Sequence, residues 1–389
     1  MKNITKTYLS ETVENLKPSG IRRFFDLAAS MEGVISLGVG EPDFVTSWSV
    51  REACILSLEQ GYTSYTANAG LLELREEISR YLASNFQVLY DPNCEIVVTV
   101  GASQALDLAL RAIINPGDEV IVVEPSFVSY APLVSLAGGV PVFVQTDGER
   151  EFKLQPEQIE KAITSRTKAM ILCSPNNPTG TVLNRRELEA ISTIVQKHDL
   201  IVISDEIYAE LAYDEPYTSF PSIPDMQERT ILVNGFSKGF AMTGWRLGFV
   251  AAPKEFAQAI LKIHQYAMMC APTMAQYGAV EALKNGANDV AEMKKSYRRR
   301  RNYFVQSLNE IGLSCHLPGG AFYAFPSIKA TGLTSEQFAE RLLLEERVAV
   351  VPGNVFGKSG EGYIRCSYAS SFEQLQEAVK RMKRFLARL

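Results

Sequence analysis

A single lysine, Lys238, stands among small residues in the segment from Gly235 to Gly248, and Arg246 follows eight positions later. A lysine amine that reacts with a carbonyl carbon needs room for a planar ligand, and small neighbours leave that room. An anionic group on the same ligand would need a fixed cation, which Arg246 can supply. Because glycines also surround lysines in ordinary loops, the segment predicts a covalent lysine site only if the rest of the chain supports one.

Seven apolar runs rich in valine and isoleucine predict the sheet that would position this lysine. They are Ile96–Val100, Val120–Glu124, Pro141–Gln145, Ala169–Cys173, Leu200–Ser204, Thr230–Asn234 and Gly248–Ala252. Strands that are apolar throughout are typical of a parallel sheet buried on both faces. Helical patterns lie between the runs, at residues 102–114, 155–163 and 184–198. The sequence therefore predicts an α/β fold, a mostly parallel seven-stranded sheet with helices on both faces.

The C-terminal part of the chain has a different pattern of long polar helices and short strands. The strand candidates there are Phe322–Phe325, Val348–Val351 and Tyr363–Ser367. We expect a large domain of residues 46–285 and a smaller α+β domain of residues 1–45 together with 286–389. The basic run Lys294–Arg301 falls within a helical pattern, so we interpret it as a solvated helix face rather than a phosphate-binding patch.

Composition narrows the function classes. A chain of 389 residues is long enough for about two domains. A net charge of −5 gives no global electrostatic support for a nucleic-acid partner. Six cysteines without CxxC spacing predict reduced thiols, with no metal site and no disulfide framework. No apolar run has the length of a membrane span, and the first ten residues lack the core of a signal peptide, so we expect a cytoplasmic protein.

Ligands of open parallel sheets bind beyond the carboxyl ends of the strands, and two such ends carry suitable groups. Gly101, Ala102 and Ser103 follow one strand and open a helix, where backbone N–H groups and a hydroxyl can hold an anion. Alternatively, Ser103 caps the helix. Phe127 follows the next strand and offers an aromatic face, although a packed core ring is the alternative.

Two further strand ends add polar groups. Asn177 lies in a rigid turn with prolines on both sides, which could also be a turn and nothing more. Asp205 ends a buried strand, where a carboxylate is costly unless it caps a helix or meets a cation or a protonated ligand nitrogen. Tyr208 adds a phenol. One sheet edge thus combines a phosphate cradle, a ring face, an amide, a carboxylate, a phenol, an amine and a guanidinium, which is the set that pyridoxal 5′-phosphate requires.

Several segments match the motifs of one enzyme family in order and spacing. They are Gly38–Phe44, Tyr65–Gly70, the turn Asn177–Gly180, the pair Asp205 and Tyr208, Gly235–Gly248, and Tyr363–Ser367. With these segments the chain resembles the fold-type I pyridoxal-phosphate-dependent aminotransferases of class I and II over nearly its whole length. In that family they form the substrate loop, the contact with the neighbouring subunit, the cofactor site and the carboxylate-binding strand.

The resemblance implies a role for each group at the sheet edge. Lys238 is expected to form a Schiff base with the cofactor and then to move a proton at the substrate α-carbon. Asp205 would keep the pyridine nitrogen protonated, while Tyr208 and Asn177 bind the phenolic oxygen and Phe127 stacks on the ring. The expected phosphate ligands are Gly101, Ala102, Ser103, Ser237, Arg246 and, from a second subunit, Tyr65. A homodimer is therefore the expected minimum active unit.

The resemblance also implies how substrate is held. Arg365 is expected to bind the α-carboxylate bidentately, with Gly40 and Asn177 beside it. Ile21 or Phe24 would close over the ligand. Dicarboxylate-specific relatives carry a second cation, in one branch a lysine at the place held here by Ser103. Aspartate is therefore not favoured over neutral, aromatic or acylated diaminopimelate donors.

The expected activity is transfer of an amino group from an amino acid to a 2-oxo acid. A pyridoxal-phosphate C–S lyase on the same fold is the alternative, because both classes retain the lysine and the aspartate. A non-catalytic effector-binding module is a remote alternative, since the chain begins close to the fold's own N-terminal arm.

Overall fold

The structure is a computed structural model that describes residues 8–16, 20 and 31–389. Its largest feature is a seven-stranded sheet with the order β2-β8-β7-β6-β5-β3-β4. β8 is antiparallel to both of its neighbours, and the other paired strands are parallel. The strands are β2 (Ile96–Thr99), β3 (Glu119–Glu124), β4 (Val140–Gln145), β5 (Thr167–Cys173), β6 (Ile201–Asp205), β7 (Thr230–Gly235) and β8 (Gly248–Ala251). All seven predicted runs are strands of this sheet, so the predicted fold class is confirmed.

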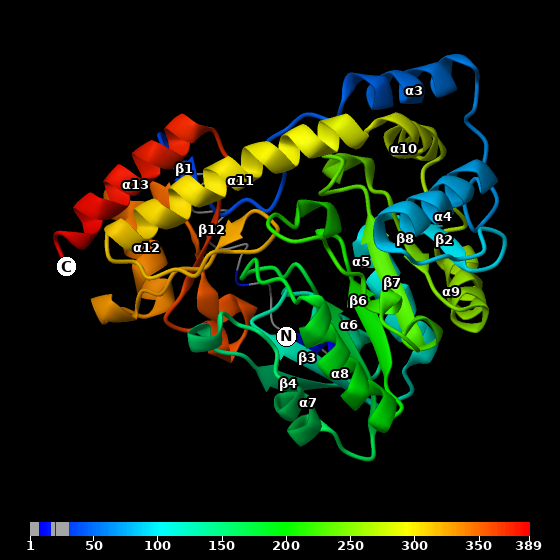
Figure 1. Ribbon diagram of the computed structural model, residues 1–389, viewed down its shortest axis with the longest axis horizontal. Coiled ribbons are helices and arrows are strands. Elements are labelled where there is room, and N and C mark those ends of the chain that lie inside the picture. The colour runs from blue at the N-terminus through cyan, green and yellow to red at the C-terminus, as the bar shows by residue number, and fades with distance from the viewer. Residues whose placement is uncertain (1–7, 17–19, 21–30) are drawn as a thin grey trace.

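Helices cover both faces of the sheet (Figure 1). One core joins alternate strand residues to α5 (Gly101–Ile113), α6 (Tyr130–Leu136) and α9 (Lys254–Ala267). The strand residues that alternate with these point to the other face of the sheet. They pack against α7 (Pro156–Ala162) and α8 (Arg185–Lys197), or against α4 (Leu72–Phe86) and α10 (Thr273–Asn285). The edge strand β4 departs from the prediction of burial on both faces, because only β3 pairs with it and several of its side chains are exposed.

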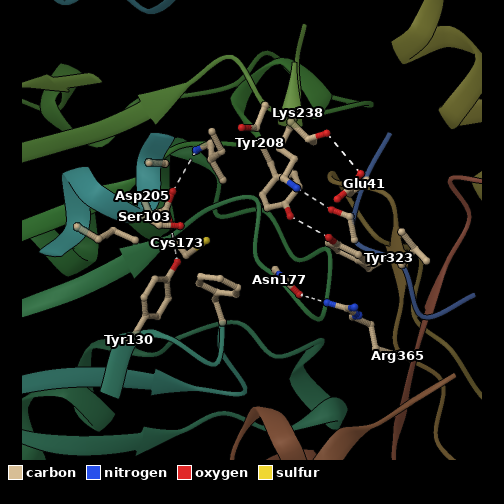
Figure 2. A pocket seen from close by; sticks show the side chains of 18 of the residues that line it. Glu41, Ser103, Tyr130, Cys173, Asn177, Asp205, Tyr208, Lys238, Tyr323 and Arg365 are labelled. Atoms are coloured by element: carbon tan, nitrogen blue, oxygen red, sulfur yellow. Dashed lines mark hydrogen bonds between the residues drawn. The ribbon is translucent and has the colours of Figure 1, made fainter. Parts of the chain in front are cut away.

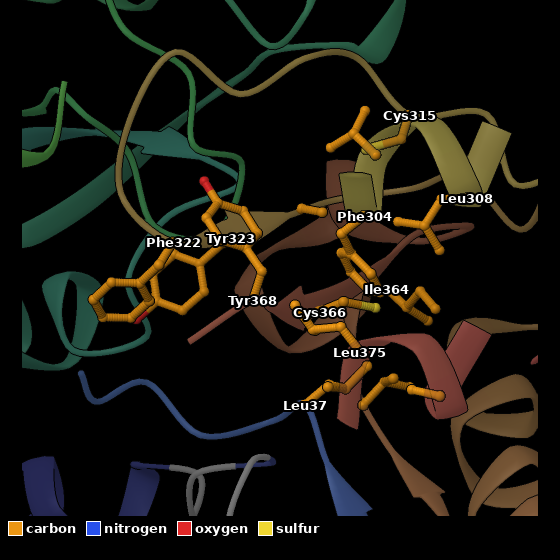
Figure 3. Close-up of a cluster of buried hydrophobic side chains, with 14 of the residues drawn as sticks. Leu37, Phe304, Leu308, Cys315, Phe322, Tyr323, Ile364, Cys366, Tyr368 and Leu375 are labelled. Atoms are coloured by element: carbon orange, nitrogen blue, oxygen red, sulfur yellow. The ribbon is translucent and has the colours of Figure 1, made fainter. Parts of the chain in front are cut away.

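A second hydrophobic core lies in the C-terminal part (Figure 3). It gathers α11 (Ala287–Glu310), α12 (Ser335–Glu346), α13 (Phe372–Leu386), β9 (Tyr323–Ala324) and β12 (Ile364–Ser367). Leu37 joins the same core, and β1 (Ile35–Ser36) pairs in parallel with β10 (Val348–Ala349). The chain near residue 36 therefore packs with residues more than three hundred positions later.

One predicted strand, Val348–Val351, is two strands in the structure. β10 pairs with β1, whereas β11 (Val351–Pro352) pairs with β12 in the antiparallel sheet β11-β12-β9. The two halves separate because they have different partners. The remaining α-helices of the described chain are α1 (Glu11–Asn15) and α3 (Trp48–Glu59). No helix in the described part has both the length and the apolar character that crossing a membrane requires.

The prediction that the basic run is a solvated helix face is wrong for two of its residues, Tyr297 and Arg301, which are buried. Arg301 is buried, and its Nη2 donates to Asp214 Oδ1 at 3.0 Å while its Nη1 donates to the Pro318 carbonyl at 2.8 Å. A guanidinium can be buried when its N–H groups find acceptors in this way. The helical prediction for this segment is confirmed by α11.

Candidate active site

A cavity of about 510 Å³ opens at the carboxyl ends of the parallel strands (Figure 2). Because these ends meet at one edge of the sheet, residues far apart in the sequence converge there. The C-terminal core supplies the opposite wall through Tyr323 and Arg365, and the segment Val39–Glu41 supplies a third. The predicted site residues in its lining are Gly40, Ala102, Ser103, Phe127, Asn177, Asp205, Tyr208, Ser237, Lys238, Arg246 and Arg365.

Lys238 follows β7 and extends its amine across the cavity. Its Nζ donates to the Gly40 carbonyl oxygen at 2.6 Å. Burial lowers the pKa of Lys238 to about 8; the carboxylate of Glu41 opposes this effect, and the guanidinium groups of Arg365 and Arg246 add to it. The amine is therefore neutral in a useful fraction of molecules near neutral pH, as a nucleophile or proton acceptor must be.

Asp205 closes the inner end of the cavity at the end of β6. The hydroxyl of Tyr130 donates to its Oδ2 at 2.7 Å, and the N–H of Ile207 donates to Oδ1 at 3.2 Å. Burial raises the pKa of Asp205, while these two donors and the charge of Lys238 act in the opposite direction. A buried carboxylate with a raised pKa favours a positively charged partner, and no α-helix begins at Asp205 in the described chain.

Arg365 projects from β12 into the cavity, and part of its guanidinium has no hydrogen-bond partner among the described residues. Its Nη1 donates to Asn177 Oδ1 at 2.9 Å, and its Nη2 donates to the Gly38 carbonyl at 2.7 Å. Nε is buried and has no partner among the described residues. Since a guanidinium has five N–H groups, this arginine can still bind a planar anion. Its Cζ lies 4.5 Å from the ring centroid of Tyr323.

Two phenols meet beside the lysine. The hydroxyls of Tyr208 and Tyr323 lie 2.9 Å apart, and either one can be the donor. Lys238 Nζ lies 5.9 Å from the ring centroid of Tyr208. The hydroxyl pair thus joins the residue beside the amine to the wall formed by the C-terminal core.

The start of α5 offers an anion site. Gly101 has a φ of +80°, and a Cβ at this position would lie 2.8 Å from Arg246 Nη2. A glycine is therefore required for the guanidinium to approach the helix N-terminus. The structure records no side-chain cap at the start of α5, so the alternative that Ser103 caps this helix gains no support. Ser103 and Ser237 instead present hydroxyls to the cavity.

Two predicted residues do not line the cavity. Gly101 lies behind it, in contact with Arg246 as described above. Tyr65 is 77% exposed, as a residue that serves a second subunit would be in a single chain. Ile21 and Phe24 lie outside the described residues.

Sequence reasoning missed several lining residues, namely Tyr130, Tyr323, Cys173, Glu41 and Thr243. Tyr130 is three positions after Phe127, one helical turn away, and this spacing was a signal that could have been read. Glu41 is adjacent to Gly40 in a segment already singled out. Nothing in the local sequence marks Tyr323, because it lies in an aromatic strand that reads as core.

The residues present fit pyridoxal 5′-phosphate. A hydroxyl- and guanidinium-lined helix N-terminus suits a phosphate, and a buried carboxylate in the same cavity suits a protonated ring nitrogen. The amine of Lys238 suits an aldehyde, and the unpartnered Nε of Arg365 is consistent with an additional anionic ligand. The donor set therefore matches the cofactor group by group.

Comparisons with known proteins agree with this geometry. The family model "Aminotransferase class I and II" matches residues 32–382. The chain is 69% identical over 380 residues to "Putative aminotransferase YugH" of Bacillus subtilis (strain 168), covering 98% of each chain. It is 50% identical over 381 residues to "Aspartate aminotransferase" of Pyrococcus abyssi, covering 97% of this chain and 98% of the relative.

A solved structure gives the same result. The aromatic aminotransferase from Pyrococcus horikoshii OT3 superposes with a TM-score of 0.90 at 49% sequence identity, covering 95% of this chain and 99% of that one. These matches support transamination and not the C–S lyase or the effector-binding module. The chain belongs to the class I and II aminotransferases and is a pyridoxal-phosphate-dependent enzyme of that family.

Proposed function

We propose that Lys238 is the residue that binds the cofactor aldehyde and moves the substrate proton, with Asp205 and Tyr208 as the other catalytic residues. One observation carries this assignment: an amine with a lowered pKa, a buried carboxylate and a partly unpaired guanidinium, from Arg365, open on one cavity. Pairs of groups with oppositely perturbed titrations in one pocket are typical of active sites.

Bound pyridoxal phosphate supplies an electron sink for the bonds at the substrate α-carbon. In our proposal Asp205 faces the ring nitrogen, and its charge keeps that nitrogen protonated. The hydrogen bond from Tyr130 supports this assignment, since it orients the carboxylate in the buried site. Tyr208 and Asn177 would donate to the phenolic oxygen of the ring, and Phe127 would lie against its face.

The phosphate would be held at the start of α5. The proposed ligands are the backbone of Gly101 and Ala102, the hydroxyls of Ser103 and Ser237, and the guanidinium of Arg246. Charge-assisted donors of this kind bind a phosphate strongly and fix the orientation of the ring relative to the lysine. With the cofactor and substrate bound, the amine of Lys238 would accept and return the proton at the substrate α-carbon.

The substrate carboxylate would bind Arg365, with Asn177 and Gly40 beside it. The described lining contains three cations, Lys238, Arg246 and Arg365, and each already has a proposed partner in the cofactor or the α-carboxylate. We therefore propose that the donor paired with 2-oxoglutarate has a side chain without charge, glutamate itself being the product formed from that acceptor. Relatives are named both for aspartate and for aromatic amino acids, so charged and uncharged donors need to be compared directly. Ranking charged, aliphatic and aromatic donors by kcat/KM, each with 2-oxoglutarate, pyruvate and oxaloacetate, answers it.

We further propose a homodimer whose active sites use residues of both subunits. Large apolar side chains are exposed along α3 and the segment after it, including Trp48, Ile55, Leu58, Tyr62 and Tyr65. A patch of this kind indicates an interface. Mixing inactive Lys238→Ala subunits with Tyr65→Phe subunits tests the sharing, because a mixed dimer would regain one intact site. Activity that never exceeds the sum of the two parents would contradict it.

The domain division and the cellular location are also proposals. A large domain of residues 46–285 and a small domain of residues 1–45 with 286–389 are supported by the separate core around α11 to α13, which Leu37 joins. A cytoplasmic location is supported by six cysteines that are all free. Limited proteolysis and cell fractionation test the two statements.

The covalent assignment has a direct test. The enzyme should show a visible absorbance band that shifts on addition of an amino acid and returns on addition of 2-oxoglutarate. Borohydride treatment followed by mass spectrometry should place the cofactor adduct on Lys238. Turnover at the wild-type rate by Lys238→Ala would exclude the proposed role of this lysine, whatever the substrate.

A further inference from the structure

Tyr323 contacts both Tyr208, which is proposed to bind the cofactor, and Arg365, which is proposed to bind the substrate carboxylate. Its hydroxyl lies 2.9 Å from the hydroxyl of Tyr208, and its ring centroid lies 4.5 Å from Cζ of Arg365 (Figure 2). We propose that Tyr323 is a positioning residue with two separable actions. Its hydroxyl donates to Tyr208 and so directs the Tyr208 hydroxyl towards the cofactor, and its ring holds Arg365 in place for the substrate carboxylate. This inference rests on the proposed roles of Tyr208 and Arg365.

The direction of the hydrogen bond follows from counting protons. A phenol has one O–H to donate, so a Tyr208 that donates into the cavity cannot also donate to Tyr323. The bond between the two hydroxyls then requires Tyr323 to be the donor. Tyr208 is the only hydrogen-bond partner that the described residues provide for the Tyr323 hydroxyl. Burial raises the pKa of both phenols, so both keep the proton that this arrangement needs.

Close packing fixes the place of the Tyr323 hydroxyl. A Cβ at Gly40 would lie 2.9 Å from this oxygen, so the backbone of the Val39–Glu41 segment covers it on that side. The ring is buried in the C-terminal core. Because the ring is packed in this core and the Gly40 backbone lies against the hydroxyl, packing favours the observed geometry of the hydroxyl pair.

Strand register places the ring under the guanidinium. In the antiparallel pair β12 and β9, Ser367 lies opposite Tyr323. Arg365 is two residues before Ser367 and therefore points to the same face of the sheet as Tyr323. The two side chains are diagonal neighbours, and the cation rests on the ring face, with Phe356 at 5.0 Å from Cζ. This contact does not depend on the tyrosine hydroxyl.

The charged and titratable groups around the hydroxyl pair come from every wall of the cavity. They are Arg365, Cys173, Glu41 and Lys238, with Asp205 beyond the lysine. A substitution at Tyr323 that keeps the ring leaves all of them in place. A change in the titration of the bound cofactor can then be assigned to the missing hydroxyl.

The first test measures the pH dependence of the visible absorbance of the holoenzyme. A hydrogen bond donated to the cofactor's phenolic oxygen stabilises its anionic form and lowers the pKa of this titration. Tyr208→Phe should raise that pKa by about one unit. Tyr323→Phe should raise it by about half a unit, because Tyr208 loses the donor that strengthens and directs its own bond. Tyr368→Phe is the matched control, a buried phenol of the same core whose hydroxyl binds the Ala321 carbonyl at 3.2 Å, and it should leave the titration unchanged.

The second test measures binding of a monocarboxylate without an amino group, 3-phenylpropionate, as a competitive inhibitor. Tyr323→Phe keeps the ring and should leave its dissociation constant unchanged. Tyr323→Leu should weaken binding about five- to tenfold through loss of the cation–π contact. Circular dichroism checks that the leucine variant is folded, and the phenylalanine variant keeps the proposal testable if it is not.

The outcomes separate this inference from the proposed function. A raised pKa in Tyr208→Phe but not in Tyr323→Phe would overturn the relay and leave the role of Tyr208 standing. No change in either variant would remove the role of Tyr208 and the relay together. Equal inhibitor affinity in Tyr323→Leu and wild type would overturn the action of the ring on Arg365.

Discussion

The lowered pKa of Lys238 makes a quantitative prediction about the reactivity of this amine. Burial and two nearby guanidinium groups bring the pKa from its usual 10.5 to about 8. At pH 7 an amine with a pKa near 8 is about 9% neutral, whereas one with the usual value is about 0.03% neutral. Since only the neutral form attacks a carbonyl group, Lys238 should react about 300-fold faster at pH 7 than an ordinary lysine of equal accessibility.

Trace labelling of the cofactor-free enzyme with acetic anhydride measures this quantity. The extent of labelling of the peptide that contains Lys238 is followed between pH 6 and 11, with Nα-acetyl-lysine added as a reference of ordinary pKa. The profile of Lys238 should reach half of its maximum near pH 8, and that of the reference more than two units higher. A shared midpoint would refute the argument that burial in this cavity activates the lysine.

Glu41 gives the same argument a directional test. Its carboxylate is the largest of the charges that raise the pKa of Lys238 against the effect of burial. Glu41→Gln removes the charge and keeps the shape, so the midpoint of Lys238 labelling should move to lower pH. An unchanged midpoint would show that the carboxylate does not act on this amine through space, and an upward shift would contradict the sign of its effect.

Four further substitutions test the surroundings of the site and the fold. Tyr130→Phe removes the donor to Asp205 and should weaken cofactor binding to the apoenzyme about tenfold, for a hydrogen bond of about 1.4 kcal/mol, in a spectroscopic titration. Glu346→Gln should lower the free energy of unfolding by about 1–3 kcal/mol at pH 7. Hydrogen bonds from C-terminal arginines lower the pKa of Glu346 in the folded protein. The stabilisation is therefore full above the usual pKa of a glutamate and is lost as the pH falls through the pKa of Glu346 in the folded protein. Denaturation curves of the wild type and of Glu346→Gln should converge in acid. Gly70→Ala should cost about 2–4 kcal/mol, because φ is +98° and a Cβ would lie 2.5 Å from a valine of β2. Gly33→Ala should cost about 1 kcal/mol in the same denaturation assay, because φ is +69° and no atom of the described residues other than its chain neighbours lies within 4 Å of the added Cβ.

The large sheet could be predicted almost completely from the sequence. A parallel strand buried on both faces must be apolar along its whole length, and such runs stand out from amphipathic helices. Within each run the bounds were correct to two residues. The short strands of the C-terminal part were harder, because two-residue strands such as β10 and β11 carry too little pattern to show where one ends and the next begins.

The candidate site was predictable wherever a polar group follows a buried strand. Asp205 is conspicuous because the apolar residues before it leave little reason for a charge, and Lys238 because it stands among small residues. Tyr130 and Tyr323 were missed for the opposite reason: a tyrosine in an apolar segment is consistent with core packing, and its hydroxyl partner is invisible. The bonds Tyr130–Asp205 and Tyr208–Tyr323 span 75 and 115 positions, and no local pattern encodes them.

Arg301 is a charged residue whose burial could not be predicted from the local sequence. Its segment is polar and helical, so a solvated face was the natural interpretation, yet its partner Asp214 lies 87 positions earlier. Burial of a charge depends on whether acceptors arrive from elsewhere in the fold. Sequence patterns report the polarity of a residue, whereas its environment is decided by tertiary contacts.

Distances within the site follow from two hydrogen bonds that join the sheet to the segments around it. Lys238 donates to Gly40 across 198 positions, and Arg365 donates to Asn177 across 188. Each bond pairs a residue at the sheet edge with one from the wall that closes the cavity, so the amine and the guanidinium are placed relative to each other by the packing of one core on the other. Sequence motifs could name both cations, but the separation between them, which decides whether one substrate can reach both, is a property of that packing.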